Sequence, residues 1–284
     1  MTLAHVHPGT APVAGGASAA LTVLAALVVL AAAVAYTAGA ARLRGRGDGW
    51  PRWRDARFAA GCLLLVWAAV GALPDGPFTG HMVRHLLVGM AAPLLLVSAR
   101  PVTLALRCLS PGRARRALVG LTHTRVVGAL VFPPVAAVVD VGGMWLLYRT
   151  GLFAAVHGRP LYDGLLHAHL LAAGLLFSFA VCQIDPVRRP RSVALRGGTL
   201  LAAGAAHAVL AKTLYAAGPP GVRFAAADLH QGARLMYYGG DVVEAALALV
   251  LGAVWLRAAD RARRRRSRAR ECGAARAAGG LTGA

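Results

Sequence analysis

The chain has 284 residues, of which 57% are hydrophobic and only 15% are charged, and its mean hydropathy is +0.58. Soluble domains carry roughly 25% charged residues, so this composition excludes an ordinary soluble domain and indicates an integral membrane protein. The formal net charge of +20 comes from arginines that lie between apolar runs, and the basic C-terminal segment has no interleaved aromatic residues. That pattern argues against nucleic-acid binding.

The apolar runs, taken in chain order, are long enough for a bundle of about seven transmembrane helices. They lie at roughly residues 20–41, 56–73, 81–99, 126–148, 164–184, 195–217 and 232–256. Pro93 in the third run, and Pro133 and Pro134 in the fourth, predict bends. The segment 100–112 is too short to span a bilayer, so we expect an interfacial helix there. The predicted fold class is all-α, a polytopic membrane helix bundle.

The sequence divides into an extracytoplasmic N-terminal segment (1–19), a transmembrane domain (20–257) and a basic cytoplasmic tail (258–284). Residues 1–20 contain no lysine or arginine, and a cleaved signal peptide needs a positive start, so we expect an uncleaved first helix. The arginine-dense tail is expected to be disordered beyond its first turns. The four cysteines form no CxxC motif, and no disulfide framework is predicted.

The arginines predict the orientation of the bundle. They crowd the linkers after the first, third and fifth runs and the C-terminal tail, whereas the N-terminus and the linker after the second run carry none. Loops rich in lysine and arginine stay in the cytoplasm. The N-terminus is therefore expected outside and the C-terminus in the cytoplasm.

The histidines show the opposite distribution. With this topology only His123 lies on the cytoplasmic side, and His207 lies near the middle of its run. The outer loops and outer helix ends hold the others: His5, His7, His81, His85, His157, His167, His169 and His230. Histidine is the commonest metal-ligating side chain, so the sequence predicts a metal site near the outer face.

His81 and His85 are the strongest candidate ligands. Residues four apart on a helix lie one above the other, so both imidazoles could turn toward one metal ion, or they could simply be polar residues at the interface. Met82 and Met90 lie nearby, and thioethers favour Cu(I), although methionine also fills apolar cores. His167 and His169 are two apart and cannot face the same partner, and we take His167 as the inward one.

Several charged side chains interrupt the apolar runs. Such residues usually pair inside the bundle, because a charge near the bilayer centre costs roughly 2.5–3.5 kcal/mol on insertion scales. Asp241 and Glu244 are three apart and share a helix face. They could neutralise Arg84 or Lys212, orient ligating histidines, or form simple ion pairs between helices.

Three blocks of sequence resemble a known family. The segment HMVRHLLVGMAAPLLLVSARPVTLALR (81–107) is similar to the histidine-pair helix of the multi-span CtaG-type cytochrome c oxidase assembly factors. RPLYDGLLHAHLLAAGLLF (159–177) and FAAADLHQGARLMYYGG (224–240) resemble that family's second histidine helix and its acidic loop. The chain departs from the family pattern at Asp163 and Tyr148, where the family often has histidines, and at Tyr237, which replaces a tryptophan.

The resemblance implies a bacterial plasma-membrane protein that helps haem–copper cytochrome c oxidase to mature by binding or delivering copper from an outer-facing histidine site. Its partners would be oxidase subunits and the lipid bilayer. The implied ligands are His81, His85 and His167, with His207 and Asp163 as further candidates, and the implied supporting residues are Arg84, Asp140, Asp228, Asp241 and Glu244.

Other functions remain open. The sequence contains no GxxxxGK[ST], GxSxG, HExxH or CxxCH motif, and no enzymatic activity is expected. A proton or metal-ion transporter would use the charges within the runs, namely Asp140, Lys212, Asp241 and Glu244. A membrane haem or electron-transfer protein would use histidines as axial ligands. A scaffold that contacts the oxidase without metal is the third alternative.

Overall fold

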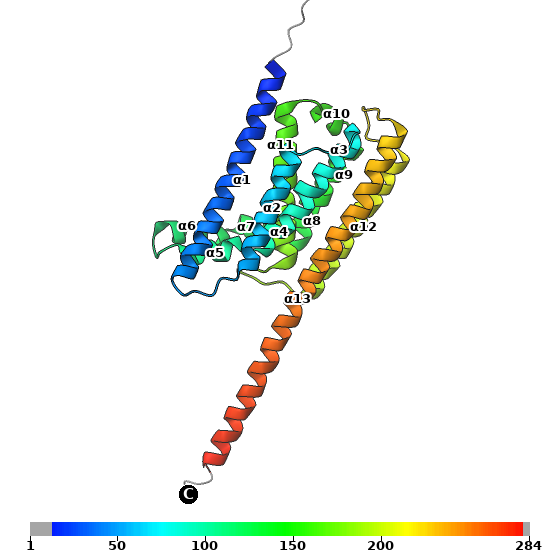
Figure 1. The fold of residues 1–284 in the computed structure, drawn as a ribbon. Coiled ribbons are helices and arrows are strands. Elements are labelled where there is room, and N and C mark those ends of the chain that lie inside the picture. The colour runs from blue at the N-terminus through cyan, green and yellow to red at the C-terminus, as the bar shows by residue number, and fades with distance from the viewer. Residues whose placement is uncertain (1–12, 281–284) are drawn as a thin grey trace, which may run out of the picture.

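The computed structural model describes residues 13–280, and within this range the regular structure is helical with no strand. Five helices are long and apolar enough to cross a membrane (Figure 1). They are α1 (Val13–Gly45), the continuous helix Pro77–Ser98, α11 (Pro160–Cys182), α12 (Val193–Ala216) and α13 (Ala226–Gly280). The expected all-helical membrane class is confirmed, and these helices match the first, third, fifth, sixth and seventh predicted runs.

The first two helices pack together at one edge of the bundle. α1 is followed by α2 (Arg52–Val70), which covers most of the second predicted run. Near their junction Tyr36 stacks on Phe58 with ring centroids 4.0 Å apart, and its hydroxyl donates to the Ala99 carbonyl at 2.8 Å. Most of α1 is exposed, as expected for a helix that faces lipid.

The third run is one helix with a change of hydrogen-bond pattern in its middle. α3 (Pro77–Arg84) passes into the π-helical stretch η1 (His85–Ala91), and α4 (Ala92–Ser98) completes the helix. Pro93 has no N–H, and its ring would clash with the carbonyl of the residue four positions earlier. A π-type stretch accommodates this constraint, so the bend expected at Pro93 is a widened turn just before it.

The fourth run differs most from the single bent span that we predicted. It is divided into α7 (Arg125–Leu130), α8 (Pro133–Ala137), η2 (Val138–Gly142) and α9 (Gly143–Arg149), with the first break at the two prolines. The short α10 (Leu152–Val156) follows. The segment before this run forms α5 (Pro101–Cys108), as expected, and α6 (Arg113–His123), which we did not predict.

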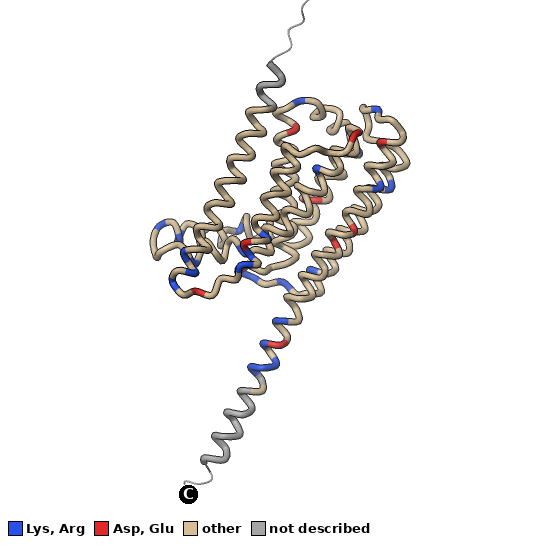
Figure 2. The backbone as a smooth tube through the Cα atoms, viewed as in Figure 1, with Lys and Arg blue, Asp and Glu red and all other residues tan. Residues whose placement is uncertain are grey.

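The C-terminal tail also differs from the prediction. α13 continues to Gly280, so the tail is helical over residues 258–280, where we expected disorder beyond the first turns. The physical reason is composition, because alanine and arginine are both strong helix formers. Lys and Arg gather at the end of the bundle from which this helix projects, opposite the first residues of α1 (Figure 2).

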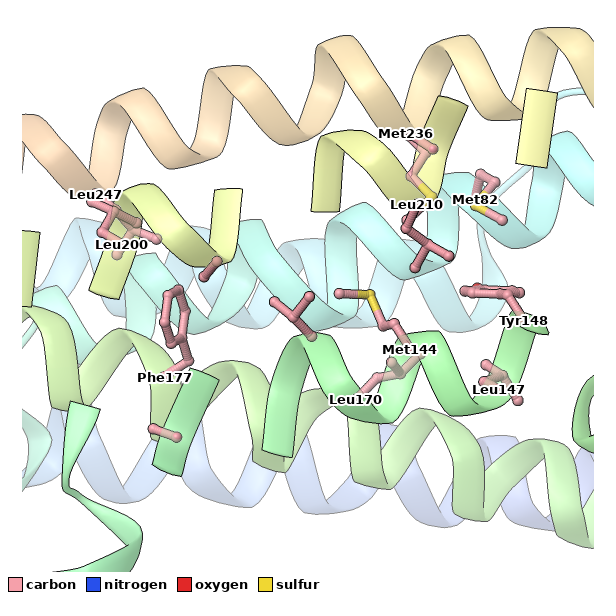
Figure 3. Close-up of a cluster of buried hydrophobic side chains, with 14 of the residues drawn as sticks. Met82, Met144, Leu147, Tyr148, Leu170, Phe177, Leu200, Leu210, Met236 and Leu247 are labelled. Carbon is pink, nitrogen blue, oxygen red and sulfur yellow. The ribbon is translucent and has the colours of Figure 1, made fainter. Parts of the chain in front are cut away.

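The main apolar core joins the third, fourth, fifth, sixth and seventh runs (Figure 3). Its largest fully buried side chains include Tyr148, Phe78, Phe153, Met82, Leu210 and Met236. Figure 3 shows Met82, Leu210 and Met236 from three helices converging near Tyr148. This is also where the candidate histidines lie, so the core positions the site.

Candidate functional site

His81 projects from α3 into the main core and is 5% exposed. Its Nε2 lies 2.8 Å from the Tyr148 hydroxyl on α9. Its ring is nearly perpendicular to that of Phe153, and the two ring centroids are 5.1 Å apart. The ring of His167 on α11 lies 6.2 Å away, centroid to centroid. His81 therefore faces α9 and α11, and its closest histidine is His167.

His85 lies one turn further along and turns toward a different helix. Its ring centroid is 5.9 Å from that of His207 on α12, and each residue is 2% exposed. Neither nitrogen of His85 has a hydrogen-bond partner among the described residues, and the same holds for Nε2 of His207. Buried polar atoms are almost always paired, so these three nitrogens are unusual for a folded core.

His207 is held in place by Glu244 across the packed pair α12 and α13. Its Nδ1 lies 3.3 Å from Glu244 Oε1. Two glycines make room for this contact: a Cβ on Gly240 would lie 2.3 Å from the His207 ring, and one on Gly204 would lie 2.2 Å from the Glu244 carboxylate. A carboxylate at Nδ1 keeps the proton there and leaves Nε2 with the lone pair that binds a metal.

His167 has the same arrangement with a different partner. Its Nδ1 donates to the backbone carbonyl of Asp163 at 2.7 Å, and the Asp163 carboxylate lies 3.5 Å away. Its Nε2 is buried and has no partner among the described residues. Asp163, which we considered as a ligand, thus contacts the far side of the imidazole and orients it.

The structure brings the four candidate histidines together as two neighbouring pairs. Metal–nitrogen bonds of about 2.0–2.1 Å place two imidazoles on one ion with ring centroids roughly 5–6 Å apart, which is close to the observed 5.9 and 6.2 Å. Among the residues whose side chains are described, no three or more His, Cys, Asp or Glu are close enough to hold one ion. The single site that we expected from His81 with His85 is replaced by pairs between helices.

A small, mostly apolar cavity with a few polar groups lies beside the second pair. It measures about 20 Å³, room for one water molecule. Its polar and sulfur-bearing lining comes from Met90, Asp140, Met144, Ser178, His207 and Glu244. Asp140, which we predicted as a supporting residue, therefore lies near His207 without contacting its ring directly.

The other predicted supporting residues lie outside the histidine pairs. Asp228 accepts hydrogen bonds from the backbone N–H groups of Phe78 and Thr79, both at 2.9 Å, and so caps α3. Arg84 donates from Nε to the Ala68 carbonyl at 3.2 Å. Asp241 is exposed, so it does not share the inward face of Glu244 as we expected.

The remaining histidines belong to neither pair, and one of them, His157, stacks on the Phe153 ring that contacts His81. His157 and His169 are exposed, and His230 stacks on Tyr215 with ring centroids 4.2 Å apart. His5 and His7 lie outside the described residues, as does the side chain of His123. The preference for His167 over His169 as the inward residue agrees with this placement.

The sequence did not single out three residues that shape the site. Tyr148 appeared only as a departure from the family pattern, yet it is fully buried and bonds to His81. Gly204 and Gly240 could have been suspected because each interrupts an apolar helix near a buried ionisable residue. That signal is weak, since glycine is common in membrane helices.

Comparison with known proteins points to one family. The family model for the cytochrome c oxidase caa3 assembly factor (Caa3_CtaG) matches residues 34–258. Uncharacterized proteins of Mycobacterium bovis and Mycobacterium tuberculosis are each 36% identical over 179 residues, and one of Mycobacterium leprae is 33% identical over 180 residues. Each match covers 60% of this chain but only 27% of the relative, so the chain aligns with about a quarter of their length. No solved structure matches.

Proposed function

Because the chain belongs to the cytochrome c oxidase caa3 assembly factor family, we propose that it helps the oxidase to mature by binding copper at its buried histidine pairs. Copper is the cargo in this proposal, taken from the outer side of the bacterial plasma membrane and passed to an oxidase subunit. The proposal rests on one observation above all. The buried rings of His85 and His207 lie 5.9 Å apart, centroid to centroid, on two different helices, and three of their four nitrogens have no partner among the described residues.

His85 and His207 form the pair best suited to hold the ion. Both are buried, their ring separation suits a shared ion, and their free nitrogens have no competing partner. His81 and His167 would form a second, neighbouring binding site. Tyr148 is hydrogen-bonded to His81, and the Asp163 carbonyl accepts a hydrogen bond from His167. Glu244 acts as a positioning residue for His207 and not as a ligand.

The surroundings favour copper over harder cations. Imidazole binds several transition metals, whereas thioethers select soft ions such as Cu(I). Met82 and Met236 are fully buried in the core that holds His81, and Met90 lines the cavity beside His207. Hard cations such as Mg²⁺ and Ca²⁺ instead require several oxygen ligands.

We also propose that the chain spans the membrane seven times, with the N-terminus outside. α2 and the interrupted segment from α7 to α9 would add two spans to the five continuous ones. The arginine-rich end of the bundle would face the cytoplasm (Figure 2). The histidine pairs would then open toward the outer side, where copper is delivered.

The test measures copper bound by the purified full chain in lipid nanodiscs after loading with Cu(I) under anaerobic conditions. The double variant His85→Ala with His207→Ala should lose at least half of the bound copper, because it removes one whole pair. A matched double variant, His157→Ala with His169→Ala, removes two exposed histidines and should retain the wild-type copper content.

Equal copper in all three proteins would contradict the proposed site. Oxidase maturation provides the second readout, measured as assembled oxidase in cells that carry each variant. If the pair variant loses copper but the oxidase still matures normally, the chain binds copper without delivering it, and the proposed function is wrong.

A further inference from the structure

Charged side chains of both signs are exposed within the spanning part of α12 and α13. Arg234, near the start of the seventh run, donates to the Tyr215 hydroxyl at 3.2 Å. Lys212 lies on α12 and Asp241 on α13, and both are exposed. Neither forms an ion pair with a residue whose side chain is described, although the Lys212 ammonium lies 5.3 Å from the Tyr237 ring centroid. Charges in membrane helices almost always face the bundle interior or a water-filled cavity.

The exposed surface of α1 provides the contrast. Residues 20–41 contain no charged side chain, and the exposed positions there are aliphatic, such as Val28 (60% exposed) and Leu30 (59% exposed). α1 therefore has the surface expected of a helix in contact with lipid. The surface of α12 and α13 differs because Lys212 and Asp241 interrupt it, although the residues around them are just as apolar, with Leu249 75% and Val242 71% exposed.

The depth of the two charges follows from the packing of α12 against α13. A Cβ on Gly240 would meet the His207 ring, so Asp241 lies at the level of the buried histidine pair. Lys212 lies five residues beyond His207 toward the α12–α13 loop, about 8 Å along the helix. Asp241 is therefore far from either end of its span, whereas Lys212 lies about one turn before the end of α12 at Ala216.

The two charges also share one side of the helix pair. Tyr237 and Asp241 are four residues apart on α13 and therefore lie one above the other. Lys212 approaches the ring of Tyr237 from α12. The surface thus presents a cation and an anion that flank Tyr237, separated by little more than one helical turn.

We propose that this surface of α12 and α13 binds a second copy of the chain, with Lys212 of each copy paired to Asp241 of the other. A two-fold axis along the membrane normal keeps every residue at its own depth, and such axes are the commonest symmetry of protein dimers. Lys212 and Asp241 differ in depth by about 8 Å along the helices, a distance that the long lysine side chain would have to span. Both ion pairs would form at once, because the surface carries both signs. An unrelated helix would have to supply an anion and a cation at matching depths.

The surface around the charges suits close helix packing. Along the same exposed side of α13, Asp241 is followed by Ala245 and Ala248, and a Cβ on Gly252 would meet nothing within 4 Å. Small residues allow membrane helices to approach closely. The ion pairs would supply the specificity, and the small residues would supply the contact area.

The test uses neutral variants that keep the size of the side chains. Each chain is prepared in a donor-labelled and an acceptor-labelled portion. The wild type and each variant are reconstituted in liposomes from both of their own portions, and the mixture combines donor-labelled Lys212→Met with acceptor-labelled Asp241→Asn. Energy transfer is measured against protein density. Each variant alone should self-associate at least tenfold more weakly than the wild type, because each leaves two like charges unpaired. The mixture should recover association, because Lys212 of one variant pairs with Asp241 of the other.

Other results would overturn the proposal. A wild-type chain that stays monomeric at every density has no such dimer, and a mixture no tighter than the separate variants excludes the reciprocal pairing. A pair formed within one chain predicts no change in association for any variant. Val28→Ala on α1 serves as the matched control and should associate like the wild type.

Discussion

At the scale of single residues, the site depends on glycine as much as on histidine. The His207 imidazole and the Glu244 carboxylate each cross the α12–α13 contact at a point where the facing helix has no side chain. This reciprocal arrangement explains how two bulky ionisable groups fit between helices that pack so closely. It also leaves Nε2 of His207 without a hydrogen-bond partner among the described residues.

Gly240→Ala should therefore displace the His207 ring. The added methyl would lie 2.3 Å from the ring, so the ring or the helix must move, and overpacking of this kind costs about 1–3 kcal/mol. We expect a lower thermal midpoint and reduced Cu(I) content, both measured on the purified chain. Gly198→Ala on α12 is the control, because its Cβ would meet nothing within 4 Å; equal behaviour of the two variants would contradict this account.

At the scale of elements, two carboxylates distant in sequence hold the starts of short helices. Asp228, in the first turn of α13, binds the first N–H groups of α3, and Asp185, in the loop after α11, binds those of Val102 and Thr103 in α5. Gly76 precedes α3 with φ of +110°, and a Cβ there would clash with the Asp228 carboxylate. The helix that carries His81 and His85 is thus anchored at its first turn by the first turn of α13.

Asp228→Ala should loosen that anchor without touching the histidines. Loss of an N-terminal cap costs about 0.5–2 kcal/mol, and the freed N–H groups of Phe78 and Thr79 should exchange with deuterium faster. Hydrogen exchange of peptides covering α3 is the measurement. Asp75→Ala, which removes an exposed carboxylate from the loop just before α3, should leave the exchange unchanged, and protection that survives Asp228→Ala would show that the cap is unimportant.

At the scale of the whole molecule, the arginines and the proposed copper-binding histidines lie toward opposite ends of the bundle. Arginine collects at the end where α5 and α6 lie (Figure 2), and α3, which carries His81, lies toward the end where α10 lies (Figure 1). One end would thus be held in the cytoplasm by its arginines, while the other receives copper. The proposed function therefore requires that the arginine-rich end of the bundle face the cytoplasm, so that the histidines lie toward the outer side.

Cysteine labelling tests this orientation. A membrane-impermeant maleimide added to intact cells should label Arg159→Cys, which lies between α10 and α11, and should not label Arg113→Cys at the start of α6. Both positions are exposed, so a difference between them reports sidedness and not burial. The wild-type chain gives the background from its own cysteines, and labelling of Arg113→Cys alone would mean the opposite orientation.

The sequence by itself determined the class of protein, the positions of most helices and the four histidines worth considering. Long apolar runs have to become helices in a bilayer, because every backbone N–H and C=O group must be paired there. The same argument placed the break at Pro133, since proline cannot continue a helix. These conclusions depend on neighbours along the chain, which a sequence records directly.

Only the tertiary structure decided which residues meet. Helix spacing suggested that His81 and His85 share one partner, but each turns toward a different helix, and Asp228 caps a helix that begins 150 residues earlier in the chain. Asp241 and Glu244 share a face by spacing, yet one is exposed and the other holds His207. Such pairings depend on how each helix is rotated and on where glycine leaves room, and both are set by packing across the whole bundle.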